Sequence, residues 1–171
     1  MDLCWTRYMN LRKYVILKDT REKTGWDFNS FDRCLTVRRW GLATGDYTAR
    51  GLEKHLTIER KASTGELALN IGKELKRFEA EMERMSHFRW AYIICEFSID
   101  DLMSFPENSG IPKKNWEFVR MNGGYMWKKI SEFKEEYNVI TLFCGNKDDA
   151  EERTMVLLDE VSEILEREQA D

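Results

Sequence analysis

The sequence is poor in cysteine, has two prolines, and lacks long apolar runs, and each shortage excludes a class of protein. Its four cysteines are widely spaced and form no CxxC pair, which argues against zinc and disulfide frameworks and favours a reducing cytoplasm. No apolar stretch approaches the roughly 18–20 residues of a membrane span, so no membrane partner is expected. Residues 1–11 contain Arg7 and no long apolar core, which argues against a secretion signal.

The composition is that of a folded chain with an uneven charge distribution. Of 171 residues, 42% are hydrophobic and 34% are charged, which fits one globular domain. The net charge is −4, yet residues 1–61 carry 13 Lys+Arg against 8 Asp+Glu. A basic first third is compatible with a phosphate backbone as ligand. Many proteins that bind no nucleic acid show a similar asymmetry, so that alternative stays open.

Hydrophobic periodicity predicts the order of the elements. We expect strands over 13–19, 34–40, the stretch after 41–47, 55–61, 90–97 and 139–144, and helices from 63 to about 86–88, from 98, and over 125–137 and 148–168. The pattern predicts an α/β three-layer sandwich with a central mixed β-sheet flanked by helices, whose early strands form a meander or hairpins. We expect one domain over 1–171: a loosely attached leader at 1–11, a core over 12–147, and an acidic-faced helix at 148–171.

The stretch from Thr44 to Lys61 organises these elements. It begins with the turn sequence TGDY, which contains Asp46, and ends with IERK. Side chains alternate faces along a strand, so Glu59 and Lys61 point one way and Arg60 the other. If the strands that carry Asp46 and Glu59 are neighbours, two carboxylates and one ammonium converge, which suits magnesium or manganese. Alternatively, an E-x-K pair on a strand commonly faces solvent.

Further acidic residues occur at the ends of other predicted strands. Asp19 ends the first strand and is followed by Arg21 and Glu22, and Glu96 ends the central apolar strand. Because strand ends gather at one edge of an α/β sheet, we expect these carboxylates to lie near Lys61. Like charges at such density require a cation or raised pKa values.

Three blocks, KDTRE at 18–22, TGDY at 44–47 and IERK at 58–61, resemble the signature of the XPF-type nuclease domain of the PD-(D/E)XK superfamily. The resemblance covers about residues 13–97. It implies a restriction-endonuclease-like fold and a Mg²⁺- or Mn²⁺-dependent endonuclease that cuts DNA at branched, flap or junction structures, as in repair and recombination. The sequence contains no helix-hairpin-helix module, so it is most similar to stand-alone members from bacteria and their viruses, which implies an intracellular protein.

The resemblance also implies roles for individual residues. Asp46 and Glu59 would bind the metal together with the backbone carbonyl of Arg60, and Lys61 would orient or help deprotonate the attacking water. Arg60 would pair with Asp19 or Glu22, or touch phosphate. The supporting residues would be Asp19, Arg21, Glu22, Glu66 and Glu96. The family pattern has an acid four positions after the lysine, where this chain has Gly65, and Glu66 is the candidate substitute.

Partner contacts are predicted from charge and aromatic content. Basic residues that could line a DNA groove, or be ordinary solvated charge, are Lys23, Arg38, Arg39 and Arg50. For the aromatic group Trp116, Phe118, Tyr125 and Trp127, packing in the core or in a lid is favoured over base stacking. The acidic last helix should lie away from the active face, or serve a homodimer, because the family pairs through its C-terminal elements.

Two other functions remain alternatives at this stage. The first is a DNA- or partner-binding domain that keeps the nuclease fold without cutting. Non-cutting members of the family typically lose the E-R-K residues, which this chain retains at 59–61. The second is a nuclease directed at RNA.

Overall fold

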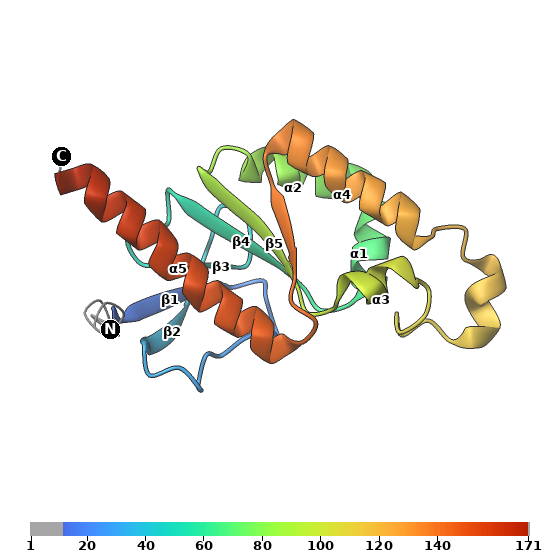
Figure 1. Ribbon diagram of the computed structural model, residues 1–171, viewed down its shortest axis with the longest axis horizontal. Coiled ribbons are helices and arrows are strands. Elements are labelled where there is room, and N and C mark those ends of the chain that lie inside the picture. The colour runs from blue at the N-terminus through green and yellow to red at the C-terminus, as the bar shows by residue number, and fades with distance from the viewer. Residues whose placement is uncertain (1–11, 171) are drawn as a thin grey trace, which may run out of the picture.

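The computed structural model describes residues 12–170 and contains a six-stranded sheet with helices on both faces (Figure 1). The predicted leader at 1–11 lies outside the described residues. The strands are β1 (Tyr14–Asp19), β2 (Cys34–Trp40), β3 (Tyr47–Ala49), β4 (Leu56–Lys61), β5 (Trp90–Cys95) and β6 (Ile140–Phe143). The helices are α1 (Thr64–Ile71), α2 (Leu75–Met85), α3 (Ile99–Met103), the 3₁₀ helix η1 (Lys113–Phe118), α4 (Gly123–Tyr137) and α5 (Lys147–Ala170).

The strand order is β2-β1-β3-β4-β5-β6, and β3 alone runs against its neighbours. The predicted mixed sheet is therefore confirmed. The expected meander or hairpins are wrong for the first two strands, because β1 and β2 are parallel. A parallel pair needs a crossover, and here the loop over 20–33 provides it in place of a helix. That loop is fixed on the sheet by Trp26 and Phe28, which are both 1% exposed.

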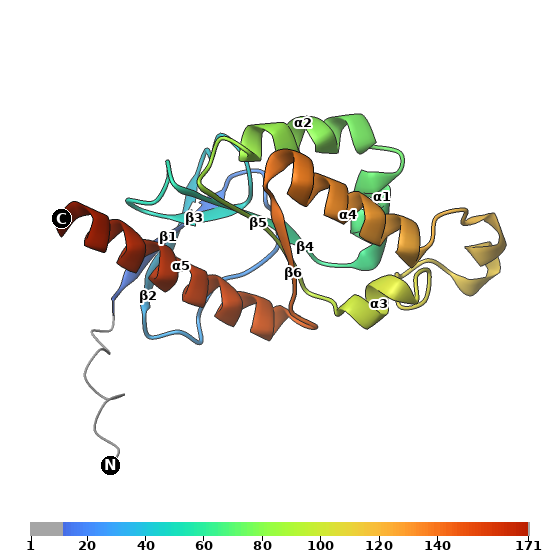
Figure 2. The same ribbon diagram turned by 45° about the horizontal axis from the view of Figure 1, so that its top comes forward.

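Two apolar cores lie on opposite faces of the sheet and make the predicted three layers (Figure 2). One core joins the sheet to α5 through residues such as Leu157 and Leu158, and it includes Trp26. The other core joins the sheet to α1, α2, α3 and α4 through residues such as Phe78 and Met82. Alternation along β5 sends Ile94 to the first core and Ile93 to the second, as expected for a strand covered on both sides.

The helix predicted from residue 63 to about 86–88 is two helices. Ser63 caps the first, because its side chain accepts a hydrogen bond from the Glu66 backbone N–H. α1 then ends at Gly72, whose backbone N–H returns to the carbonyl of Ala68, and α2 starts at Leu75. The break keeps the apolar stripe buried on one face of the sheet while the helix axis changes direction. Periodicity alone does not reveal such a break, because the apolar residues keep a spacing of three or four residues across it, at Ile71, Leu75, Phe78, Met82 and Met85.

Five strands run in one direction, so their carboxyl ends meet at one edge of the sheet. β1 ends there at Asp19, β4 at Lys61 and β5 at Cys95, and antiparallel β3 begins there just after Asp46. Cys95 is fully buried, whereas Cys144 is half-buried. Within residues 12–170, no helix combines the length and the apolar character that crossing a bilayer demands.

Candidate active site

The pairing of β3 with β4 places Asp46 opposite Glu59. Tyr47 pairs with Ile58 in an antiparallel register, so the preceding Asp46 faces the following Glu59. The Asp46 backbone N–H donates to the carbonyl of Ile58 at 2.7 Å, and one Asp46 carboxylate oxygen accepts from the Arg60 backbone N–H at 2.9 Å. Two carboxylates are therefore held on one sheet face by the strand ladder itself.

Lys61 joins these carboxylates in a buried position. Its ammonium lies 2.6 Å from Glu59 Oε1 and 3.6 Å from Glu66 Oε1, and it sits 5.0 Å from the ring centre of Phe78. Glu59 is 7% exposed and Lys61 is 3% exposed. The alternative in which the E-x-K pair faces solvent is therefore wrong. The cause lies in the tertiary structure, because α2 covers the sheet face on which both side chains point.

The electrostatics of this group are those of a site short of positive charge. Burial, together with the charge of Glu59, raises the pKa of Asp46 to about 8. Burial acts to lower the pKa of Lys61, but the carboxylates of Glu59, Glu66 and Asp46 outweigh it, and the pKa lies above its ordinary value. Lys61 is thus a cation at neutral pH, and it balances one of two closely placed acids.

A second network occupies the opposite face of the sheet around Arg60. Its guanidinium donates to Glu96 at 2.7 Å and lies 3.6 Å from Glu22. The indole N–H of Trp26 donates to the same Glu96 oxygen at 2.6 Å, and the Trp26 ring stacks on Tyr47 at 4.7 Å. The expected gathering of all the acids near Lys61 is wrong for Glu22 and Glu96. Strand alternation directs Glu96 to the face of Arg60, and Glu22 reaches Arg60 from the loop after β1.

Asp19 forms a third, local arrangement. Its carboxylate accepts from the Arg21 side chain at 2.6 Å, from the Arg21 backbone N–H, and from the Leu42 backbone N–H at 2.9 Å. Burial acts to raise the pKa of Asp19, but these hydrogen bonds outweigh it and the pKa lies below its usual range. The pairing of Arg60 with Asp19 is therefore wrong, and the pairing with Glu22 is correct.

Steric crowding explains why a glycine occupies position 65, where the XPF-type pattern has an acid. A Cβ added there would lie 2.5 Å from the backbone carbonyl oxygen of Ser109. The next residue, Glu66, hydrogen bonds to the Ala62 backbone N–H at 2.9 Å and reaches Lys61. The structure thus brings Glu66 to the lysine from the first turn of α1, as expected of a substitute for the acid missing at position 65.

The predicted DNA-contacting residues Lys23, Arg38, Arg39 and Arg50 are all exposed. Arg39 pairs in register with Lys18, one residue from the end of β1, and donates to two loop carbonyls. Arg50 follows β3 and reaches the level of Val15, because antiparallel β3 runs from the site edge toward the other end of the sheet. It therefore lies toward the end of the sheet opposite the edge that carries Asp46, and its contact with DNA stays a prediction.

Three contacts of the site were not predicted from sequence. They involve Trp26, which hydrogen bonds to Glu96, Phe78, which lies near the Lys61 ammonium, and Glu81. Burial raises the pKa of the Glu81 carboxyl, with a further contribution from the charge of Glu59. The spacing of Phe78 and Glu81, three residues apart on one helix, is a signal that could have placed both on the face toward Lys61.

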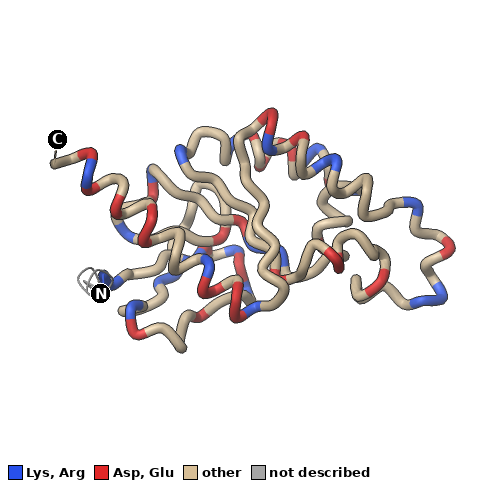
Figure 3. Tube along the Cα trace, in the orientation of Figure 1, with Lys and Arg blue, Asp and Glu red and all other residues tan. Residues whose placement is uncertain are grey.

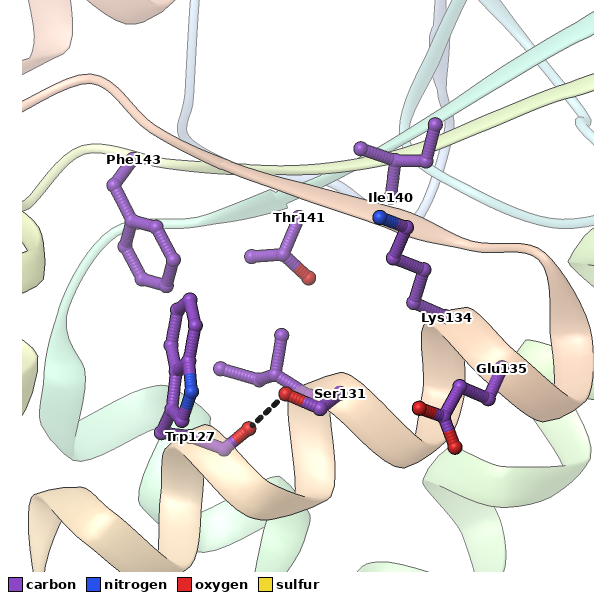
Figure 4. A pocket seen from close by; sticks show the side chains of 8 residues that line it. Trp127, Ser131, Lys134, Glu135, Ile140, Thr141 and Phe143 are labelled. Carbon is purple, nitrogen blue, oxygen red and sulfur yellow. Dashed lines mark hydrogen bonds between the residues drawn. The ribbon is translucent and has the colours of Figure 1, made fainter.

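A hollow of about 430 Å³ lies elsewhere, between α4 and the edge strand β6 (Figure 4). Its lining includes the facing rings of Trp127 and Phe143, the Thr141 hydroxyl, and Lys134. None of the predicted site residues lines it. It belongs to the C-terminal elements, where the homodimer prediction placed its contact, and that dimer stays a prediction.

The structure resembles two solved structures of XPF from Aeropyrum pernix, one of them a complex with DNA. The first has a TM-score of 0.62 at 14% identity and covers 85% of this chain and 60% of that chain. The DNA complex has a TM-score of 0.64 at 14% identity and covers 88% of this chain and 66% of that one. This chain thus spans less than two thirds of either. No protein-family model and no curated protein matches the sequence. The expected XPF nuclease-like fold is confirmed.

Proposed function

We propose that this chain, which has the fold of an XPF nuclease, is a metal-dependent endonuclease that hydrolyses DNA phosphodiester bonds. The observation that carries the proposal is the set formed by buried Glu59 and Lys61 with half-buried Asp46 at the carboxyl edge of the sheet. The two carboxylates carry more negative charge than the single lysine neutralises, and a divalent cation would supply the missing positive charge.

The residues present fit Mg²⁺ or Mn²⁺. Magnesium is commonly held by one or two carboxylates, with water and substrate phosphate as the other ligands. Within residues 12–170, no three His, Cys, Asp or Glu side chains form a preformed cage, so the fit is to an open site of that kind. Asp46 and Glu59 would hold the ion, with the Arg60 carbonyl as a third donor. When bound, it supplies Lewis-acid stabilisation of phosphoryl charge and activation of water.

The other residues then take roles that follow from their positions. Lys61 is protonated in this environment, which favours orienting water and stabilising phosphoryl charge over abstracting a proton. Glu59 and Glu66 hold the Lys61 ammonium in place from two sides. Arg60 is tied to Glu22 and Glu96 on the far face, so it stabilises the strand that presents Glu59 and Lys61.

Cleavage assays test the mechanism. Asp46→Ala and Lys61→Ala should each lower Mg²⁺-dependent cutting of labelled nicked, flap, fork and junction DNA by two orders of magnitude or more, as is typical for loss of such groups (about 10²–10³-fold). The folded state is monitored by circular dichroism, and the exposed Asp32→Asn is the control. Full activity in either active-site variant contradicts the mechanism.

A binding domain that does not cut is the second candidate function, favoured by the low identity to the solved nucleases. It predicts salt-sensitive DNA binding with no cleavage and no Mn²⁺ binding at Asp46 and Glu59 at millimolar metal. An RNA-directed nuclease is separated by digesting matched DNA and RNA substrates side by side. Preferential cutting of RNA would replace DNA as the substrate while leaving the site chemistry intact.

A further inference from the structure

The chain between α3 and α4 forms a lobe, residues 104–122, that projects from one end of the molecule (Figures 1 and 2). Its base is anchored in the fold: Phe105 is 6% exposed and Ser109 is 8% exposed. Val119 and Met121 pack on the core that also includes α1, α2 and α4. Both ends of the lobe are thus fixed, and only the tip extends into solvent.

The base of the lobe is seated on the helix that follows the active-site lysine. The Ser109 carbonyl lies so close to Gly65 that no side chain fits there, and Met121 approaches Gly72 at the other end of α1. α1 begins at Thr64, three residues after Lys61. The lobe is therefore a rigid extension of the edge at which the proposed cleavage occurs.

The tip of the lobe exposes an aromatic ring among cations. Phe118, at the end of η1, is 74% exposed, the highest value among the large exposed hydrophobic residues. Lys113 and Lys114 open η1, Arg120 follows it, and the acids of the lobe are Glu107 and Glu117 (Figure 3). Within the described residues, five of the eight large exposed hydrophobics fall in 99–127. The expectation that Phe118 packs in a core or lid is wrong.

We propose that the lobe binds a single-stranded arm of the substrate, with a base stacked on Phe118 and the phosphates on either side near Lys113, Lys114 and Arg120. Every base offers a π face, so an exposed ring binds strands of any sequence, and flanking cations match the phosphate charge. A duplex keeps its bases stacked inside and would gain nothing from the ring. This inference rests on the proposed function and assigns the arm to a surface outside Asp46, Glu59 and Lys61.

Binding without cleavage tests the lobe directly. Fluorescence anisotropy in EDTA compares an oligo-dT strand, a matched oligo-rU strand and a blunt duplex on the wild type, Phe118→Ala, Lys113→Gln/Lys114→Gln and the control Leu35→Ala. Leu35 is 58% exposed on edge strand β2. We expect Phe118→Ala to weaken single-strand binding by about five-fold or more while duplex binding is unchanged, as loss of one base stack predicts. Photocrosslinks from bromodeoxyuridine strands should map to residues 113–120.

Each contrary outcome is distinct. Equal strand binding by Phe118→Ala and the wild type overturns the inference, as does an equal loss on blunt duplex. Concentration-dependent self-association that disappears in Phe118→Ala, with strand binding intact, would make the lobe a protein contact instead. Because the binding assay contains no metal, it can succeed when no substrate is cleaved, which would refute only the proposed function. Cleavage that needs Asp46 but strand binding indifferent to Phe118 would refute only the lobe.

Discussion

Lys61 has its ammonium group almost completely buried beside Glu59, and that position determines what the residue can do. A buried charge is costly without partners, and here two carboxylates compensate it. The same carboxylates hold the pKa of Lys61 above its ordinary value, so the residue stays a cation. The remaining imbalance falls on Asp46, whose raised pKa marks the place where a further positive charge would be most stabilising.

Replacing Asp46 by asparagine should stabilise the metal-free protein. In the unfolded chain an aspartate ionises at about pH 3.9, whereas burial and the Glu59 charge raise the pKa of Asp46 in the fold to about 8. Between those values the folded state binds more protons than the unfolded state, so stability falls as pH rises. An asparagine does not ionise, so the variant avoids this loss of stability with rising pH. Its side-chain oxygen can still accept the hydrogen bond from the Arg60 backbone N–H.

Thermal unfolding in EDTA measures this effect. The Tm gain of Asp46→Asn over the wild type should be largest near about pH 8. The gain should shrink toward zero as the pH falls toward about 4. Adding Mn²⁺ should raise the Tm of the wild type but not of Asp46→Asn. A Tm difference that does not vary with pH would show that Asp46 is ionised throughout, and Asp32→Asn serves as the exposed control.

At the scale of elements, the site depends on how α1 and the lobe meet. Gly65 and Gly124 are both the second residue of a helix, α1 and α4 respectively. A Cβ at Gly65 would lie 2.5 Å from a backbone oxygen, whereas a Cβ at Gly124 would lie 3.4 Å from the nearest side-chain atom. Substituting alanine at both positions therefore separates the effect of helix propensity from the effect of close packing between α1 and the lobe.

Gly65→Ala should destabilise the protein by about 1–3 kcal/mol, because the Ser109 backbone must move to admit a methyl group. Gly124→Ala should be neutral or stabilising, since alanine is the better helix former by up to about 1 kcal/mol. Urea unfolding of both variants supplies the comparison. Equal effects at the two positions would mean that the lobe gives way readily, contrary to the close packing described for its base.

For the whole molecule, the two sheet faces differ in what they present to a polyanion. Arg38 pairs in register with Leu17 and shares the face on which Asp46, Glu59 and Lys61 lie. The acidic helix α5 covers the opposite face, as predicted, and its charges include Glu163 and Arg167 (Figure 3). DNA bound at the proposed site would therefore lie on the sheet face opposite the negative charges of α5.

Arg38→Gln should weaken DNA binding at low salt and lower the slope of log K against log salt by about one unit, because one phosphate contact is lost. Arg167→Gln removes another exposed arginine, from α5, and should leave the slope unchanged. Salt titrations of binding to one duplex with both variants provide the measurement. An unchanged slope for Arg38→Gln would remove that face of β2 from the DNA contact.

The order of elements and the shared face of Glu59 and Lys61 were predictable because they depend on local signals. Strand alternation fixes the shared face of Glu59 and Lys61, and apolar runs bounded by turns fix the strands. The break at Gly72 and the parallel pairing of β1 with β2 were not predictable, because each depends on contacts with residues distant in sequence.

The sequence by itself determined which residues are candidates for the proposed chemistry, since residue type and strand period are local properties of the chain. Only the tertiary structure decided which of them share an environment. It sent Glu22 and Glu96 to Arg60 and left Asp46 and Glu59 with Lys61, because a sheet covered on both faces separates neighbouring side chains into two buried compartments. It also exposed Phe118, because no element packs against the tip of the lobe within the described residues.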